Sequence, residues 1–193
     1  MQHHQHHHQH QQQQQHQQHQ HEQRGVTLIE SLVVMVITAV ILSVALPSFE
    51  SARARRHLDG MAAQLETELQ FARSLAVARN ETVRIGFEAK GATSCVIIHS
   101  GSPGDCVCGV GGPAVCKADA QEIRTTRLDA LSPVSVHSNS RSIGFSPHFG
   151  TVTPTATMEV ANRRGEVVRL VVNIMGRVRS CTPNVQVTGY ARC

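Results

Sequence analysis

The sequence predicts an α+β protein, in which one long N-terminal helix packs on an antiparallel β-sheet domain. Three observations lead to this fold class. An apolar run covers positions 26–46, a helical stripe of apolar residues follows it, and after Asn80 the apolar residues alternate as they do in strands. The predicted parts are a leader over 1–25, a transmembrane helix over 26–47, its amphipathic continuation over 48–80 and a β-rich domain over 81–193.

Residues 1–25 differ in composition from everything that follows them. Between positions 2 and 23 the chain is almost entirely His and Gln, and so polar a segment cannot bury a core. Clustered imidazoles can bind metal, but a low-complexity leader that is cleaved and discarded is the favoured interpretation. No apolar stretch precedes Gly25, which excludes an ordinary secretory signal peptide.

The segment after Gly25 is long and apolar enough to cross a membrane. About 21 residues, rising 1.5 Å each, span roughly the 30 Å of hydrocarbon in a bilayer. Glu30 is the single charged residue in this run. A charged group at membrane depth is costly and usually marks function. Pro47 closes the run and is expected to bend the helix rather than end it.

Beyond Pro47 the predicted helix continues as an amphipathic segment. Asn80 suits a C-cap, so the helix is expected to run from about 26 to 79, with Gly60 as an internal weak point. The apolar residues recur at three- and four-residue steps, at Leu58, Met61 or Ala62, Leu65, Leu69, Ala72 and Ala76. This stripe predicts the face that packs on the β-rich domain.

From residue 81 onward, strand-like segments alternate with turns rich in Gly and Pro. In the first segment, 82–87, the apolar residues Val83, Ile85 and Phe87 fall on one face. The other predicted strands are 95–99, 134–137, 142–145, 156–160, 167–173 and 178–181. Together they predict an antiparallel sheet.

The octapeptide RGVTLIES at 24–31 resembles the type IV prepilin signal, in which a leader ends in Gly and a Glu stands four residues beyond the new N-terminus. Pro47 stands where type IV pilins commonly carry a kink-forming proline. The resemblance implies that prepilin peptidase cuts after Gly25 and that Val26, where the family more often has Phe, becomes the methylated N-terminus. It also implies that Glu30 pairs with the N-terminal amine of an adjacent subunit during assembly.

The segments FARSLAVARN at 71–80, TVRI at 82–85 and VVNIMGRVR at 171–179 resemble the GspH/FimT family, and most of all its FimT-type minor pilins. The family comprises pseudopilins of type II secretion and minor pilins of type IV pili. The resemblance implies a pilin-like fold and a single inner-membrane pass with a periplasmic C-terminal domain. It further implies assembly with other pilins or pseudopilins in a pilus or pseudopilus. Arg24 alone is a weak cytoplasmic anchor, so the orientation rests on the cleavage signal.

The C-terminal end of the chain is locally basic. From Val160 onward there is one acid, Glu166, against six arginines, at 163, 164, 169, 177, 179 and 192. On a strand, Arg177 and Arg179 would share a face and lie roughly 7 Å apart, a spacing suited to neighbouring phosphates of one nucleic-acid strand. In FimT-type minor pilins a Gly-Arg-x-Arg pattern in this region is associated with DNA binding during natural transformation.

The predicted function is therefore that of a type IV pilus minor pilin that binds double-stranded DNA through its phosphates, without reading sequence. A turn at Gly176 is expected to present Arg177 and Arg179 together with Arg163 and Arg164 of the neighbouring hairpin, and Arg192 is the fifth candidate DNA-binding residue. A solvated basic edge strand is the plainer interpretation of these arginines. The alternative function is a GspH-like pseudopilin of the type II secretion system, with a structural role and no DNA partner. A bitopic membrane protein unrelated to pili is a third, and it requires an uncut leader.

All six cysteines lie beyond the membrane segment, where a periplasmic domain permits disulfides. Cys181 and Cys193 bracket eleven residues and are expected to pair, closing the tail into a loop beside Arg179 and Arg192. The pairing of Cys95, Cys106, Cys108 and Cys116 stays open, with Cys106–Cys108 the least favourable. A metal site at Cys106, Cys108 and Cys116 is an alternative of low specificity.

No pattern of catalytic residues is found in the sequence. The histidines outside the leader are scattered, and the chain has no nucleophile elbow, phosphate loop or carboxylate pair at catalytic spacing. Neither an enzyme nor a cofactor is therefore predicted. Aromatic residues are also scarce, with no Trp, one Tyr and five Phe, so platforms for base stacking are poorly supplied.

Overall fold

The structure is a computed structural model that describes residues 26–90, 93–109, 111–117, 119–183 and 187–193. The predicted leader, including Gly25 and its His/Gln tract, lies outside the described residues. The chain divides into two compact units, Met1–Pro47 and Ser48–Cys193. The helix α2 (Leu28–Arg79) contributes to both of them.

The hydroxyl groups in the first half of α2 are satisfied within the helix. Thr27 caps its start, because the Thr27 Oγ1 accepts a hydrogen bond of 3.3 Å from the backbone N–H of Glu30. The hydroxyl of Thr38 donates to the carbonyl of Val34 at 2.6 Å, so this polar residue costs little in an apolar segment. By length and composition, α2 can cross a membrane. Pro47 lies inside the helix and does not end it, as predicted.

The C-terminal end of α2 confirms the predicted C-cap. Asn80 adopts a left-handed conformation with φ of 51°. Its N–H donates to the carbonyl of Val77 at 3.3 Å, and the N–H of Glu81 donates to that of Ala76 at 3.2 Å. These two bonds form a Schellman motif, which satisfies carbonyls that the last helical turn would otherwise leave unpaired.

The amphipathic part of α2 buries the predicted stripe. Its six buried apolar residues are each at most 2% exposed; they are Leu58, Ala62, Leu65, Leu69, Ala72 and Ala76. The sequence left Met61 and Ala62 open for one position of the stripe. Ala62 is the buried one, and Met61 packs at the edge of the core. Glu68 is also buried, which the pattern did not predict. Its Oε1 accepts hydrogen bonds from Thr126 Oγ1 at 2.6 Å and from Gln64 Nε2 at 3.1 Å.

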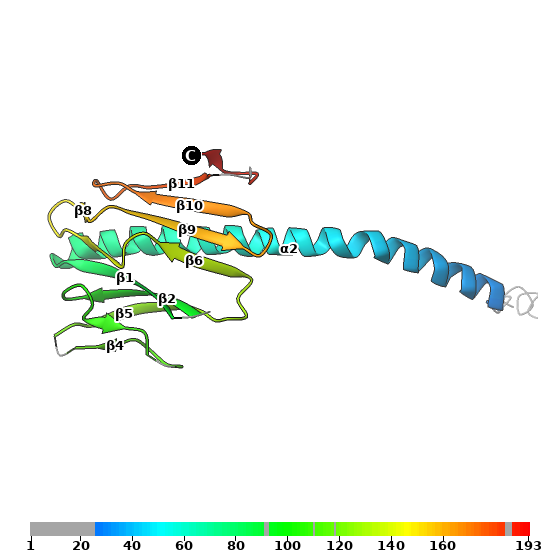
Figure 1. The fold of residues 1–193 in the computed structure, drawn as a ribbon, viewed down its shortest axis with the longest axis horizontal. Coiled ribbons are helices and arrows are strands. Elements are labelled where there is room, and N and C mark those ends of the chain that lie inside the picture. Colours follow the sequence, from blue (N-terminus) through cyan, green and yellow to red (C-terminus); the bar gives the residue numbers. More distant parts are fainter. Residues whose placement is uncertain (1–25, 91–92, 110, 118, 184–186) are drawn as a thin grey trace, which may run out of the picture. The chain divides into compact units, whose positions relative to one another are not determined.

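Two five-stranded sheets pack against the Ser48–Arg79 part of α2 and share one hydrophobic core with it (Figure 1). The first sheet has the order β5-β2-β1-β7-β8, with β1 Val83–Lys90, β2 Thr93–Ser100, β5 Glu122–Leu128, β7 Ser142–Phe145 and β8 Val152–Thr153. The second has the order β12-β11-β10-β9-β6, with β6 Val134–Ser138, β9 Ala156–Asn162, β10 Val167–Val172, β11 Val178–Thr182 and β12 Ala191–Arg192. Among the described strands, only β11 and β12 pair in parallel.

All seven predicted strands are present, and the α+β fold class is confirmed. Strand β5 was not predicted, because its sequence EIRTTRL carries charges within the run and it lies at a sheet edge, where Leu128 is its one buried residue. The pair β3 (Cys106–Val107) and β4 (Val115–Cys116) forms a third, two-stranded sheet. Strands this short carry no periodicity that a sequence pattern can reveal.

Replacing Gly60 with Ala is expected to stabilise the Ser48–Cys193 unit by about 1 kcal/mol. Gly60 lies within α2, and a Cβ added there meets no heavy atom within 4 Å. The substitution therefore restricts the unfolded chain without straining the folded one. Urea unfolding of the two proteins measures the difference. Ala63→Gly, at an exposed position one turn further along α2, is the matched control and should destabilise by a similar amount. A loss of stability in Gly60→Ala would contradict the expectation.

Candidate functional site

The first turn of α2 holds Glu30, the charged residue of the apolar segment. Its backbone N–H is used in the cap with Thr27, but its carboxylate accepts no hydrogen bond and forms no ion pair within the described part of the chain. The side chain is exposed. The fold of this chain therefore does not use the Glu30 carboxylate, which is free to meet a group from another molecule.

A tight turn between β10 and β11 positions the Arg177–Arg179 pair. The side-chain Oδ1 of Asn173 accepts from the N–H of Arg177 at 3.0 Å, and the N–H of Asn173 donates to the carbonyl of Arg177 at 3.1 Å. Gly176 closes the turn with φ of +70°, a conformation that favours glycine. Arg177 thus directly precedes β11, and Arg179 is the second residue of that strand.

Arg179 projects from the sheet face that is turned away from α2, whereas Arg177 stands just before β11 at the end of the sheet, beside α2. The residues that alternate with them point toward the helix: Val178 packs on the core, and the Ser180 hydroxyl donates to Glu66 of α2 at 2.9 Å. Both arginines are exposed, and neither forms an ion pair with any described residue. The geometry therefore presents two guanidinium groups without an ion pair at the start of β11.

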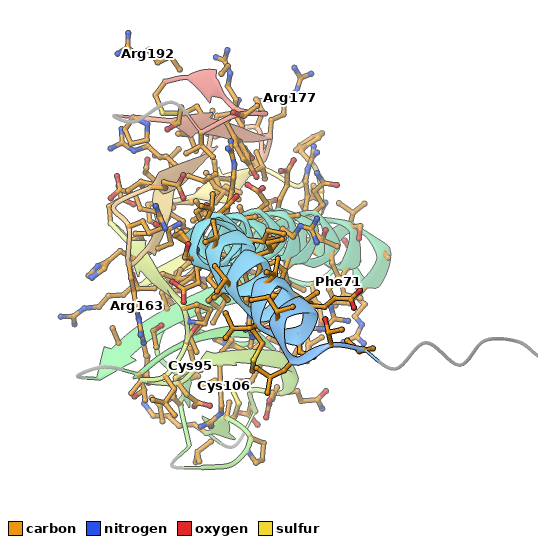
Figure 2. All side chains as sticks on the ribbon, turned by 90° about the vertical axis from the view of Figure 1, so that its right-hand side faces the viewer. Phe71, Cys95, Cys106, Arg163, Arg177 and Arg192 are labelled. Carbon is orange, nitrogen blue, oxygen red and sulfur yellow. A yellow bond between two sulfur atoms is a disulfide. The ribbon has the colours of Figure 1, made fainter. Side chains whose placement is uncertain are left out.

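Arg163 and Arg164 do not join this pair, and the expectation that they would was wrong. They lie in the turn between β9 and β10, whereas Arg177 lies beyond the other end of β10. The six residues of β10 separate the two turns by about 20 Å. Figure 2 shows Arg163 and Arg177 on different sides of the domain. Arg192, on β12, pairs with Thr182 at the end of β11 that is remote from Arg177.

The local excess of positive charge is smaller than the sequence count indicates. Arg169 of β10 lies opposite Glu159 of β9 and donates to its Oε1 from Nε at 2.9 Å and from Nη2 at 2.6 Å. Glu159 lies just before Val160, where the count of charged residues begins, so that count does not include its negative charge. Because Arg169 is paired, the arginines without an ion pair among the described residues of this sheet are the exposed ones at its turns and edge.

Beside Arg177 lies a groove of about 670 Å³ that sequence reasoning did not find. It is lined by Gln70, Arg73, Ser74, Val77 and Ala78 of α2, by Phe149 of the β7–β8 loop, and by Gly176, Arg177 and Val178. The Nε of Arg73 donates to the carbonyl of Gly150 at 3.1 Å, and the N–H of Val152 donates to that of Ile174 at 2.9 Å. Three segments far apart in the sequence therefore meet here, which no local pattern predicts.

The structure joins Cys181 to Cys193 and so closes the C-terminal tail, as expected. The tail then docks on α2. Val187 is fully buried, and Nη2 of Arg55 donates to the carbonyl of Thr188 at 3.0 Å. Burial raises the pKa of the Tyr190 hydroxyl, and the nearby carboxylates of Asp59 and Glu66 raise it further. The tail is thus held against the helix.

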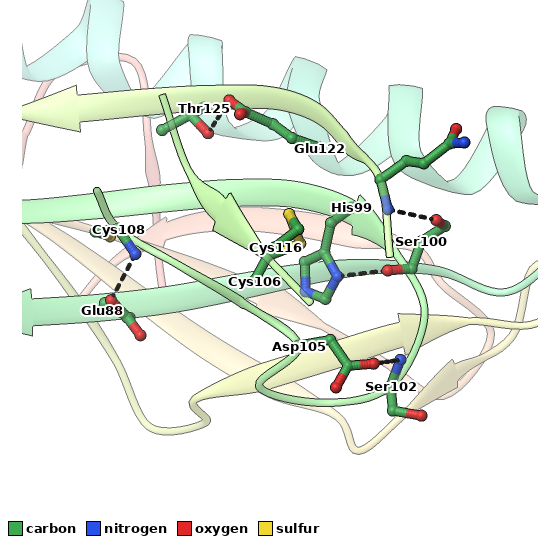
Figure 3. Close-up of a disulfide and its surroundings, with 11 residues drawn as sticks. Glu88, His99, Ser100, Ser102, Asp105, Cys106, Cys108, Cys116, Glu122 and Thr125 are labelled. Atoms are coloured by element: carbon green, nitrogen blue, oxygen red, sulfur yellow. Dashed lines mark hydrogen bonds between the residues drawn. A yellow bond between two sulfur atoms is a disulfide. The ribbon is translucent and has the colours of Figure 1, made fainter. Parts of the chain in front are cut away.

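The other four cysteines form the pairs Cys95–Cys108 and Cys106–Cys116. Figure 3 shows this region, where the N–H of Cys108 donates to the Glu88 carboxylate at 2.9 Å. All six cysteines are in disulfides, so the alternative metal site has no free thiolate to offer. The two bonds instead close a loop over the outer face of β2, where a second small core contains Cys95, Ile97, Cys106 and Ala120.

Two family profiles match the chain. The profile described as type II transport protein GspH matches residues 61–176, and the prokaryotic N-terminal methylation motif matches residues 21–46. No curated protein matches. Among solved structures, the type IV minor pilin FimU of Pseudomonas aeruginosa strain PAO1 is similar with 20% identity and a TM-score of 0.48, covering 67% of this chain and 95% of that one. The minor pseudopilin EpsH from the type 2 secretion system of Vibrio cholerae is similar with 10% identity and a TM-score of 0.45, covering 67% and 99%.

The GspH profile covers more than half of the chain, and the methylation motif covers the start of α2. The methylation motif covers positions 24–31, and the GspH match covers positions 71–85 and ends at Gly176, so Arg177 and Arg179 lie just beyond it. The chain therefore belongs to the family of the type II transport protein GspH and carries the N-terminal methylation motif of pilin-like subunits.

Proposed function

We propose that this protein is a type IV pilus minor pilin that binds DNA for natural transformation through Arg177 and Arg179. In this proposal prepilin peptidase cuts after Gly25, α2 anchors the subunit in the inner membrane with the globular unit in the periplasm, and other pilins then take it into a filament. The role is structural rather than enzymatic. The family match and the methylation motif support the pilin-like part. The exposed and unpaired arginine pair supports the DNA-binding part.

The arrangement of the pair suits a nucleic-acid backbone. Side chains two residues apart on a strand lie roughly 7 Å from each other, so Arg177 and Arg179 can reach neighbouring phosphates. Contacts of this kind release counterions and read no bases, so binding should be insensitive to sequence and should weaken with salt. For two phosphate contacts, the affinity is expected to fall about tenfold between 50 and 200 mM salt.

The double variant Arg177→Ala/Arg179→Ala is expected to bind duplex DNA at least about tenfold more weakly and with a shallower salt dependence. Fluorescence anisotropy with a labelled duplex of mixed sequence measures both quantities. The matched control is Arg163→Ala/Arg164→Ala, which removes the same charge from the turn at the opposite end of β10. We expect this control to bind nearly as well as the wild type. Equal losses in the two double variants would show that only net charge matters and would contradict the site.

The second candidate function is a pseudopilin of a type II secretion machine, and the description of the matching family favours it. A pseudopilin needs the same processing and the same α2, but no DNA partner. The binding assay distinguishes the two, because a pseudopilin should show no measurable affinity for DNA even at about 50 mM salt, where phosphate contacts are strongest.

A further inference from the structure

The walls of the groove beside Arg177 combine cations with exposed apolar surface. Arg73 and Arg177 both line it, and none of its lining residues is acidic. Phe149 is 79% exposed, and Val77 is 48% exposed. Phe149 and Val77 line the same groove, and exposed apolar surface gathered beside a cation such as Arg177 is characteristic of a binding surface.

The loop that carries Phe149 is held in place, but the ring of Phe149 is not used by the fold. The loop is fixed on both sides: the Arg73 side chain donates to the carbonyl of Gly150, and the N–H of Gly150 donates to the carbonyl of Ser146 at 2.9 Å. The described aromatic neighbour of the ring, His148, lies 6.4 Å away at 56°, which is not a stacked arrangement. The face of the ring is therefore open to a partner.

We propose that this groove takes an unpaired nucleobase, which stacks on Phe149 while Arg177 holds the adjoining phosphate. This inference rests on the proposed DNA-binding function and adds a substrate class to it: single-stranded DNA is preferred over duplex. Every base has a π face, so such stacking tolerates any sequence. In a duplex the bases are already stacked and paired, so the groove contributes nothing there.

Charge decides between this occupant and a neighbouring pilin subunit. An apolar groove alone would suit a protein partner, but the positive charge of Arg73 and Arg177, with no acid in the lining, favours an anionic one. A DNA strand supplies aromatic surface and negative charge in every nucleotide. Although aromatic residues are scarce in this chain, stacking one base needs one ring, and Phe149 lies in the same groove as Arg177.

The test compares two labelled probes, oligothymidylate and a mixed-sequence duplex of equal length, on the full chain in detergent micelles. Phe149→Ala is expected to weaken oligothymidylate binding on the order of tenfold and to leave duplex binding unchanged. Phe149→Trp should retain the wild-type preference. Leu131→Ala is the control, because Leu131 is 89% exposed and lies outside the groove. Phe149 is so exposed that its loss should not unfold the domain.

The outcomes separate this inference from the function on which it rests. If the wild type binds neither probe, the DNA-binding function fails and the inference fails with it. If the wild type binds duplex and Phe149→Ala changes neither affinity, or lowers both equally, only the base-stacking inference is overturned. The inference is also overturned if Phe149→Ala keeps both DNA affinities but lowers incorporation into filaments, since the groove then contacts a neighbouring subunit.

Discussion

Replacing Gly176 with Ala is expected to destabilise the Ser48–Cys193 unit by about 2–4 kcal/mol, from two separate causes. Gly176 has φ of +70°, a left-handed conformation that costs an L-residue about 1 kcal/mol or more. In addition, an added Cβ would lie 2.3 Å from the carbonyl oxygen of Gly150 and 3.1 Å from Nε of Arg73. The carbonyl belongs to the backbone, so the two segments have to move apart.

Gly165→Ala is the matched control for Gly176→Ala. Gly165 lies in the turn at the opposite end of β10 and has φ of +80°, but a Cβ added there meets no atom within 4 Å. It should therefore show the conformational cost alone, about 1 kcal/mol. Urea unfolding of the Ser48–Cys193 unit measures both variants, since all buried apolar residues of the described chain lie at Leu58 or beyond. Equal losses in the two variants would contradict the close packing around Gly176.

This packing also changes how the GRVR motif at 176–179 is interpreted. The resemblance associates the whole motif with DNA binding, but the structure gives its first residue a different task. Gly176 allows the β10–β11 turn to pack against Gly150 and Arg73, and it thereby sets where Arg177 stands. In the proposed function, a Gly176 variant would weaken DNA binding by distorting the turn, so only the arginine variants test the proposed contact with phosphate.

Local patterns were sufficient to predict the helix. The stripe from Leu58 to Ala76 repeats at helical spacing, and Asn80 ends it with a conformation that few other residues adopt readily. These features depend on neighbours within four or five residues. Strands with alternating apolar residues, such as β9, were predicted for the same reason, because a half-buried strand repeats every second residue.

The placement of the arginines required more than local patterns. Turns that follow each other along an antiparallel sheet lie at opposite ends of the strand between them, so the order β9, β10, β11 separates Arg163 from Arg177. The predicted strands by themselves already imply that separation. The groove is different. Its walls come from α2, the β7–β8 loop and the β10–β11 turn, and only the tertiary fold brings Phe149 to Arg177.

Replacing Glu30 with Ala is expected to leave processing intact and to lower incorporation into filaments by on the order of a hundredfold or more. In the assembly implied by the prepilin resemblance, the Glu30 carboxylate meets the N-terminal amine of a neighbouring subunit. Removing one partner leaves the other charge unpaired in an apolar environment, which costs more than the intact pair. Mass spectrometry of the N-terminus should show methylated Val26 in both proteins, and blotting of sheared filaments measures incorporation.

The capping of α2 makes this test specific to the carboxylate. Thr27 accepts its hydrogen bond from the backbone N–H of Glu30, and Ala keeps that N–H, so the substitution should not disturb the start of the helix. Glu30→Gln keeps the size of the side chain and removes the charge, so it should fail in assembly as Glu30→Ala does. Glu50→Ala, an exposed acid on the same helix beyond Pro47, should assemble normally. Normal assembly of both Glu30 variants would show that the carboxylate is merely tolerated, and failure of Glu30→Ala with success of Glu30→Gln would assign it a hydrogen bond rather than a charge.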